Sequence, residues 1–293
     1  MDNNTTSKAK SNWLSKLLVT IFPAGVWMTG FFVAPLILIV VVSFCTRGEV
    51  GDVVYKFTLS NYVRLLNPLY LNIFWNSILV AVYTTVFCLL FGYPFAFIIA
   101  NVKKKYKPIM LLLIMLPFWT NSLVRTYAMI ILLRTEGIIN TVLLNLGIIQ
   151  APLHMMYNNF AVMVGMIYMM FPFMVLPLYT SIEKLDRRLL DAAADLGASP
   201  VKKFMKVTLP LTKGGIVAGC LLVFIPTLGL FFITDLMGGS KVVLMSNLIK
   251  NQFLTARDWP FGAAISVILI IVMVALILIN SKMGGSKESK GVL

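Results

Sequence analysis

The sequence from Ser181 to Ile216, SIEKLDRRLLDAAADLGASPVKKFMKVTLPLTKGGI, is a long polar interruption in an apolar chain, and it decides the fold. Gly197 predicts the end of a first helix, because glycine accepts the left-handed backbone that helix ends often need. Ser199 and Pro200 predict a second helix start, with a capping oxygen and a proline in the first turn. An apolar stripe runs along the first helix at Leu185, Leu189, Ala192 or Ala193, and Leu196.

Two functions are open to this pair of helices. One is an amphipathic helix that lies on the membrane surface, which typically carries bulky apolar residues and cationic flanks. The segment Asp191–Asp195 offers methyl groups and two carboxylates instead. Because small residues allow a close approach to another protein, we expect this segment to dock into a groove of a partner.

The composition is that of an integral membrane protein. Of the 293 residues, 59% are hydrophobic and only 12% are charged, with a mean hydropathy of +0.89, whereas a soluble domain has about 25% charged residues. The net charge of +14 could indicate nucleic acid, but no basic patch with interleaved aromatic residues belongs to a soluble module. We expect no nucleic-acid partner, and we interpret the positive charges as topology signals.

Six apolar segments are long enough to cross a bilayer as helices, which takes about 20 residues. They predict an all-α integral membrane domain over residues 19–281, between polar tails at 1–18 and 282–293, with the first segment kept as a signal anchor. Seventeen lysines and arginines fall on the side of both termini and the Ser181–Ile216 segment, against seven on the other side. This asymmetry places both termini in the cytoplasm. The segments are Val19–Phe44, Ile73–Ala100, Pro108–Leu133, Phe160–Ser181, Thr212–Leu236 and Phe261–Ser281.

The spacing of Asp191-Ala192-Ala193, Gly197 and Leu209-Pro210 resembles the "EAA" loop of ABC import permeases, the cytoplasmic element that contacts the ATPase subunit. The resemblance implies a type I ABC importer permease fold with a coupling loop over residues 182–212. Asp191 departs from the usual glutamate, which shortens the side chain by one methylene. The coupling residues implied are Asp191, Ala192, Ala193, Asp195, Leu196, Gly197, Ala198 and Ser199.

Four further blocks are similar to the permease family of bacterial spermidine/putrescine importers. This narrower resemblance implies a bacterial inner-membrane location and a heterodimer with a second, homologous permease. It also implies two copies of an ABC ATPase that carry ATP and Mg, and a periplasmic or lipid-anchored polyamine-binding protein. The blocks are PFWTNSLVRTYA at 117–128, LPLYTSIEKLD at 176–186, ITDLMGG at 233–239 and RDWPFGAA at 257–264.

The chain lacks the residues that catalysis would need. No Gly-x4-Gly-Lys-Ser/Thr loop for ATP occurs. His154 is the single histidine, so no metal cluster and no nucleophile–base set can be assembled. We therefore expect neither an enzyme nor a cofactor bound by this chain.

Ionisable residues at or within the spans are the candidate substrate site. Asp235, near the outer mouth of the fifth span, is either an anionic site for a cationic substrate or a carboxylate that reaches interfacial water. Phe231, Phe232 and Trp259 could add cation–π contacts, or they belong to an interfacial aromatic belt. Arg125 either snorkels, gates the substrate or pairs with an acid such as Asp235. Asp258 in an outer loop is a further candidate, or a contact for the binding protein, as is Glu136.

Other transport classes stay open. Within the same class, the substrate could be another small cation, or an anion such as thiosulfate, for which Arg125 would become the ligand. An ion-driven secondary transporter would typically show repeated halves or several buried acids. A membrane scaffold would have little use for so many spans interrupted by proline or glycine.

Overall fold

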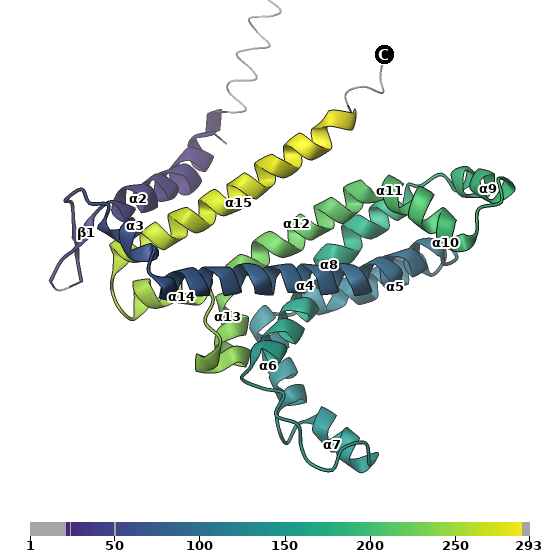
Figure 1. Ribbon diagram of the computed structural model, residues 1–293, viewed down its shortest axis with the longest axis horizontal. Helices are drawn as coiled ribbons and strands as arrows, with labels where there is room; N and C mark the ends of the chain where they lie inside the picture. The colour runs from purple at the N-terminus through teal and green to yellow at the C-terminus, as the bar shows by residue number, and fades with distance from the viewer. Residues whose placement is uncertain (1–21, 24, 50, 289–293) are drawn as a thin grey trace, which may run out of the picture. The chain divides into compact units, whose positions relative to one another are not determined.

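The computed structural model describes residues 22–23, 25–49 and 51–288, most of which are helical (Figure 1). Helices dominate because backbone groups in lipid must be satisfied within the segment itself. The chain divides into two compact units. Unit 1 comprises residues 1–65 and 252–270, and unit 2 comprises residues 66–251 and 271–293.

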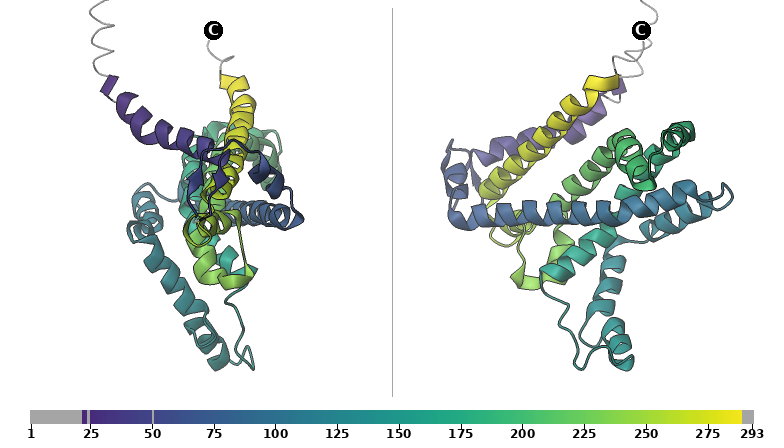
Figure 2. Two further views of the ribbon diagram at one scale, coloured as in Figure 1. Left: turned by 90° about the vertical axis from the view of Figure 1, so that its left-hand side faces the viewer. Right: turned by 45° about the vertical axis from the view of Figure 1, so that its right-hand side comes forward.

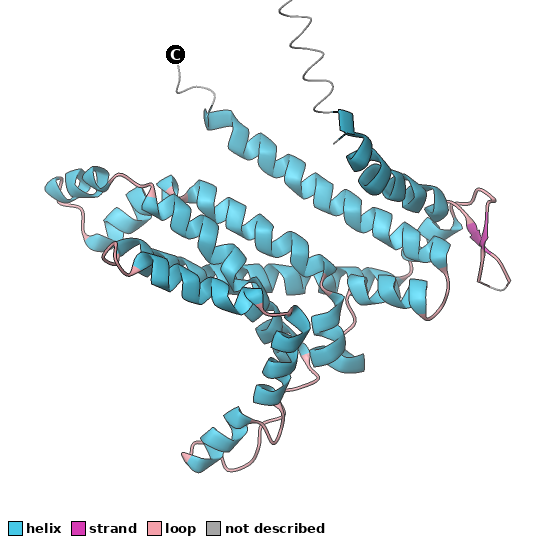
Figure 3. Ribbon diagram, turned by 180° about the vertical axis from the view of Figure 1, so that it is seen from behind, coloured by secondary structure: helices cyan, strands magenta, loops and turns pink. Residues whose placement is uncertain are grey.

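Unit 1 combines short helices with a small β-hairpin, drawn in magenta in Figure 3. The hairpin pairs Thr46 with Val54 and Arg47 with Val53 in antiparallel register. This hairpin departs from the all-α prediction, although it covers only two residues on each strand. The elements are η1 (Thr29–Val33), α2 (Ala34–Ser43), β1 (Thr46–Arg47), β2 (Val53–Val54), α3 (Ser60–Leu65) and the first part of α15 (Trp259–Glu288).

Unit 2 is built on α4 (Pro68–Asn101), α8 (Asn159–Glu183) and α12 (Lys213–Gly229), which pack against one another. Methionines of α8 fill the space between them, with Met166 and Met174 fully buried. Two glycines bring α12 close to α8: a Cβ on Gly215 would lie 2.4 Å from Ser181 Cβ, and one on Gly219 would lie 2.8 Å from Met174 Sδ. Small residues in a membrane helix allow this kind of close approach between helices.

Besides Ile271–Glu288 of α15, unit 2 contains shorter elements in addition to this three-helix core. In Figure 2, α6 and α7 project away from it. These elements are α5 (Lys107–Met115), η2 (Leu116–Trp119), α6 (Ser122–Leu133), α7 (Ile138–Asn145), α9 (Arg187–Asp195), α10 (Pro200–Lys203), η3 (Phe204–Thr208), α11 (Leu209–Leu211), α13 (Phe231–Ile233), η4 (Thr234–Gly238), η5 (Gly239–Lys241) and α14 (Met245–Leu254), whose last three residues belong to unit 1.

Five helices of the described residues are long and apolar enough to cross a membrane. A sixth is added if Pro200–Leu211 and Lys213–Gly229, bent by 65° at their junction, count as one span. With that pair counted, the number agrees with the prediction, but the third and fifth spans differ most in their extent. The predicted third span, Pro108–Leu133, breaks after Trp119, because a 3-10 turn over Leu116–Trp119 ends there and Asn121 caps a new helix. The helical segment that is long enough to span is Ser122–Asn145. The predicted fifth span is interrupted after Gly229.

The tails lie largely outside the described residues. The predicted N-terminal tail at 1–18 and the first residues of the first span are among those not described. At the other end, α15 continues to Glu288, so part of the predicted C-terminal tail is helical.

Candidate functional site

The segment between α8 and α12 forms two short helices that meet at Gly197, as predicted. Gly197 has φ +75°, the left-handed backbone that favours glycine. Its amide donates to Ala194 O at 2.8 Å, and the amide of Ala198 donates to Ala193 O at 3.0 Å. These two hydrogen bonds form a Schellman motif, which satisfies the last carbonyls of α9.

Side chains cap the start of both short helices. Asp186 accepts a hydrogen bond from the amide of Arg188 at 3.0 Å and so begins α9. Ser199 accepts from the amide of Lys202 at 3.4 Å and begins α10, with Pro200 in the first turn. The predicted helix starts at Ser199-Pro200 are confirmed, whereas Leu185 precedes α9 rather than lying on it.

The α9–α10 segment exposes an apolar surface. Leu196 is 89% exposed, and Leu189, Val201 and Met205 are exposed as well. Leu185, which also belongs to the predicted stripe, lines a cavity together with Leu190, so not every residue of the stripe lies on the exposed side. Asp191, Ala192 and Asp195 also lie on the exposed side. Because large exposed apolar side chains beside charged ones mark interaction sites, this surface is a candidate docking surface.

An ion pair anchors the start of the segment between α8 and α12, which we call the α9–α10 loop. The ammonium of Lys107, at the start of α5, donates to both carboxylate oxygens of Glu183 at 2.9 and 2.7 Å. It also donates to the carbonyl oxygen of Ala100 near the end of α4 at 2.7 Å. A cavity of about 400 Å³ lies beside the pair and is lined in part by Leu185 and Leu190. The base of the loop is therefore tied to α4 and α5.

A second anchor holds the end of the loop. The hydroxyl groups of Tyr93 on α4 and Thr212 lie 2.8 Å apart. Thr212 donates its proton to Thr208 O at 2.8 Å, so Tyr93 is the donor of the pair. The ring of Phe204 meets Tyr93 edge-on at a centroid distance of 5.5 Å. Both ends of the loop thus rest on the same part of α4.

Asp235 lies on η4, beyond the break that ends α12. One carboxylate oxygen accepts a hydrogen bond from the side-chain amide of Asn247, and the other pairs with the ammonium of Lys250 at 2.5 Å. The same ammonium lies 5.8 Å from the ring centroid of Phe231. Phe232 packs edge-on against Phe231 and borders the core. The Asp235 carboxylate and the Phe231 ring thus contact one alkylammonium group, and Asn247 fixes the carboxylate.

Arg125 is buried elsewhere in unit 2 and does not pair with Asp235, whose carboxylate is held by Lys250 and Asn247. Arg125 is only 7% exposed, and its Nε makes no hydrogen bond to any described residue. Its guanidinium lies 5.5 Å from the ring of Phe118. A largely apolar cavity of about 540 Å³ adjoins it. The suggested pairing of Arg125 with Asp235 is therefore wrong in this structure.

Two other residues that were predicted to lie in outer loops share one cavity of unit 2. Glu136 and His154 both line a cavity of about 520 Å³, together with Arg134 and Tyr157. The sequence separation of Glu136 and His154 gave no reason to expect this proximity.

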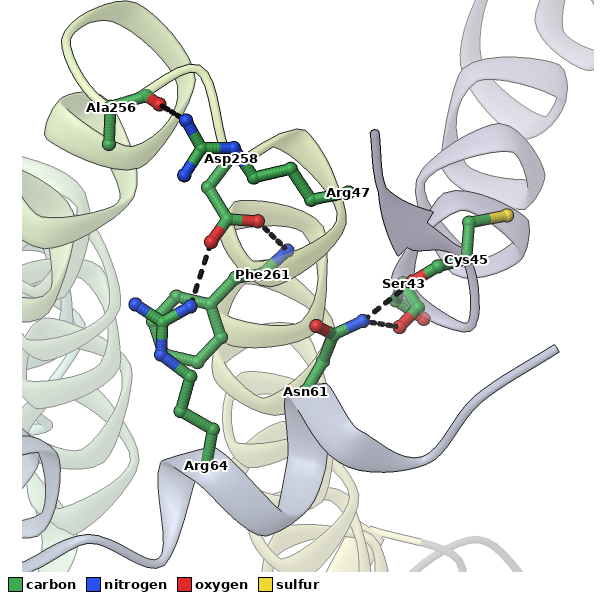
Figure 4. Close-up of polar contacts among 8 residues, drawn as sticks. All are labelled: Ser43, Cys45, Arg47, Asn61, Arg64, Ala256, Asp258 and Phe261. Atoms are coloured by element: carbon green, nitrogen blue, oxygen red, sulfur yellow. Dashed lines mark hydrogen bonds and ion pairs between the residues drawn. The ribbon is translucent and has the colours of Figure 1, made fainter. Parts of the chain in front are cut away.

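Asp258 lies in unit 1 and is 4% exposed (Figure 4). Its carboxylate pairs with the guanidinium of Arg64 at 2.8 Å and accepts a hydrogen bond from the amide of Phe261 at 3.3 Å. Arg64 also lies over the Phe261 ring, 3.9 Å from its centroid. Asp258 therefore caps the start of α15 and ties it to α3, which indicates a structural role.

Further hydrogen bonds hold unit 1 together around this pair. Asn61 on α3 donates to Ser43 O at 3.0 Å and to Cys45 O at 2.9 Å, and Figure 4 shows both contacts. Arg47 on the hairpin donates to Ala256 O at 2.8 Å. Trp259, the other candidate from this region, is exposed and packs edge-on against Phe253 at 5.8 Å.

Comparison with known proteins identifies the family of this chain. The model of the binding-protein-dependent transport system inner membrane component family matches residues 92–281, which include the α9–α10 loop and Asp235. This chain belongs to that family. It is 46% identical over 272 residues to the spermidine/putrescine transport system permease protein PotB of Haemophilus influenzae, covering 93% of this chain and 94% of that protein.

Other relatives agree with this assignment. The PotB protein of Escherichia coli K12 is 49% identical over 253 residues, covering 86% of this chain and 92% of that protein. Among solved structures, a bacterial ABC transporter for import of the acidic polysaccharide alginate has a TM-score of 0.74 at 16% identity, covering 98% of this chain and 100% of that chain. At this identity the likeness shows the fold, which is that of an ABC importer permease.

Sequence reasoning missed two residues of this permease's candidate site. Asn247 and Lys250 hold Asp235 from 12 and 15 residues further along the chain. Both lie on α14, a helix of low hydrophobicity outside every predicted span. Asn247 and Lys250 are three residues apart, which places them on one helix face. This spacing is the only feature of the local sequence that could have indicated a shared role.

Proposed function

We propose that this chain is the permease subunit of an ATP-driven importer of polyamines such as putrescine and spermidine. The observation that carries the proposal is the ion pair between the Asp235 carboxylate and the primary ammonium of Lys250. It occurs in a chain that is 46% and 49% identical to two PotB proteins. A lysine side chain is four methylenes ending in an ammonium, the same group as one end of putrescine. The site therefore has the chemistry that a polyamine end requires.

Three groups supply recognition in this proposal. Asp235 provides the negative charge, and Phe231 provides an aromatic face for a cation–π contact worth about 0.5–2 kcal/mol. Asn247 fixes the carboxylate by donating to Asp235 Oδ1 and also to Phe231 O at 3.0 Å. Phe232 supports the Phe231 ring from its edge. Asp258 and Trp259 have partners within unit 1, and we assign them no direct contact with the substrate.

The energy comes from a separate subunit in this proposal. Two copies of an ABC ATPase would carry ATP and Mg, and each would contact a permease. The exposed Leu196, with Asp191 and Ala192 beside it, supports a docking role for the α9–α10 loop. The excess of lysine and arginine on the side of this loop supports its placement in the cytoplasm, together with both termini.

Two more partners complete the proposed assembly. A second, homologous permease would form the other half of the transport pathway, and a polyamine-binding protein would deliver the substrate to the outer face. The structure of an alginate ABC transporter in complex with an alginate-pentasaccharide-bound periplasmic protein, which this chain resembles at a TM-score of 0.72, supports this kind of partner. The shared fold says nothing about the cargo.

Uptake by reconstituted vesicles tests the proposal. The complex of this permease with its partner subunits, supplied with the binding protein and ATP, should accumulate radiolabelled putrescine or spermidine. Unlabelled polyamines should compete, whereas thiosulfate and divalent metal ions should not. Competition by thiosulfate without polyamine uptake would contradict the proposal and would direct attention to Arg125 as an anion ligand.

A further inference from the structure

The two oxygens of Asp235 are held in different ways. Oδ1 accepts from Asn247, whose side chain is buried and also bonds Phe231 O and the amide of Leu244 at 3.0 and 3.2 Å. An amide with three partners at this depth is fixed in place. Asn247 is thus a permanent part of the site.

Oδ2 of Asp235 pairs with a partner that is able to move. The side chain of Lys250 is 28% exposed and that of Asp235 is 32% exposed, so the pair lies at the surface of unit 2 and not in its core. Lysine carries its charge on a flexible stem that readily exchanges partners. An exposed pair of this kind contributes little to stability and is easily broken. The Oδ2 position is therefore exchangeable.

We propose that Lys250 is a built-in competitor for the substrate, which neutralises Asp235 when the site is empty and is displaced by the ammonium of an incoming polyamine. This inference rests on the proposed function and adds a residue that sets specificity. The Lys250 ammonium lies where the carboxylate and the Phe231 ring both reach it, which is the place that a substrate ammonium would take.

A resident ammonium has two consequences for transport. It neutralises the Asp235 carboxylate, which would otherwise be an unpaired charge at the edge of the membrane, where such a charge is costly. It also raises the affinity that a ligand needs in order to bind Asp235, because the ligand must replace an ammonium that already has the right geometry. A small hydrated cation with a single charge gains little by this exchange, whereas a polyamine also contributes a methylene chain and a second ammonium.

Equilibrium binding of radiolabelled putrescine to the purified complex, without the binding protein, tests the inference. Omitting the binding protein matters because its own affinity would otherwise dominate uptake. In the Lys250→Met variant, putrescine should bind about three- to fivefold more tightly than in the wild type, as expected for removal of an exposed competing charge. Lys250→Arg should retain the competitor and show no such gain.

Two controls separate competition from other effects. Lys241→Met removes an exposed positive charge from the same region and should leave putrescine affinity unchanged. The double variant Asp235→Asn with Lys250→Met should lose the gain, because the exchanged oxygen is no longer charged. Unchanged or weaker binding in Lys250→Met, in a complex that still assembles and hydrolyses ATP, would overturn the inference.

The proposed function is judged separately from this inference. If wild-type vesicles accumulate putrescine while Lys250→Met binds it no more tightly, the importer assignment stands and the role of Lys250 is rejected. If wild-type vesicles with the binding protein accumulate no polyamine, the assignment itself is rejected.

Discussion

Lys107 and Glu183 join the end of α8 to the start of α5 through two hydrogen bonds of 2.9 and 2.7 Å. Glu183 is the last residue of α8 and stands three positions before Asp186, which caps α9. The same ammonium holds the carbonyl of Ala100 on α4. A force applied to the α9–α10 loop therefore reaches α4 and α5 through this pair.

Replacing Lys107 by Met should weaken both the fold and coupling. It leaves the Glu183 carboxylate without its cation, and we expect a loss of about 1–3 kcal/mol, moderated because Glu183 reaches water. Thermal unfolding of the purified complex and the ratio of putrescine transported to ATP hydrolysed measure the two effects. The exchange Lys107→Glu with Glu183→Lys should restore part of the coupling. If each single variant couples normally, the pair has no such role.

Gly197→Val should uncouple transport from ATP hydrolysis. The left-handed backbone at this position costs a β-branched residue about 1–2 kcal/mol, while a Cβ there meets nothing within 4 Å. The effect is therefore conformational rather than steric. Gly197→Asn is the matched control, because asparagine tolerates this backbone. Normal uptake with normal retention of the ATPase in the valine variant would contradict this account of the turn.

Leu196→Asp should abolish retention of the ATPase and leave the permease folded. The side chain is 89% exposed, so its loss removes little from the fold itself. Co-purification of the ATPase with a tagged permease is the measurement. Leu146→Asp, at an exposed position after α7, is the control and should retain the ATPase. Equal retention in both variants would show that the docking surface lies elsewhere.

Asp235→Asn should weaken putrescine binding with the assembly intact. A charge-assisted hydrogen bond is lost, so the affinity should fall by about tenfold or more. Direct binding to the purified complex measures the change. Wild-type affinity in this variant would remove Asp235 from the substrate site.

Asp258→Asn should act on stability rather than on substrate binding. It breaks a pair in which the Asp258 side chain is 5% exposed and the Arg64 side chain 46% exposed, so we expect a loss of about 1–2 kcal/mol, less than for a pair buried on both sides. A lower unfolding temperature with unchanged putrescine affinity is the expected result. Weaker binding without loss of stability would return Asp258 to the substrate pathway.

Local features of the fold were predictable from the sequence. The turn at Gly197 and the helix start at Ser199 depend on residues within a few positions, so backbone chemistry alone predicted them. The break of the third span also has a local cause, because a 3-10 turn ends at Trp119 and Asn121 caps a new helix. The sequence predicts spans interrupted by proline or glycine, but the cap at Asn121 was not recognised as a helix start.

Contacts between distant residues were not predictable in this way. Asp235 has its partners on α14, and Asp258 pairs with Arg64 at a separation of 194 residues. Such pairs depend on how helices pack, which periodicity does not report. The nearest expectation, a bond between Asp235 and Arg125, chose the wrong cation because it considered only charges within predicted spans.

The side of the membrane that the α9–α10 loop faces is the most direct test of the importer assignment. In a Leu196→Cys variant, a membrane-impermeant thiol reagent reports the exposed position, since the natural Cys45 and Cys88 are buried and Cys220 is partly buried. The account predicts labelling in inside-out vesicles and protection when the ATPase is bound. Labelling from the outside of intact cells would contradict it.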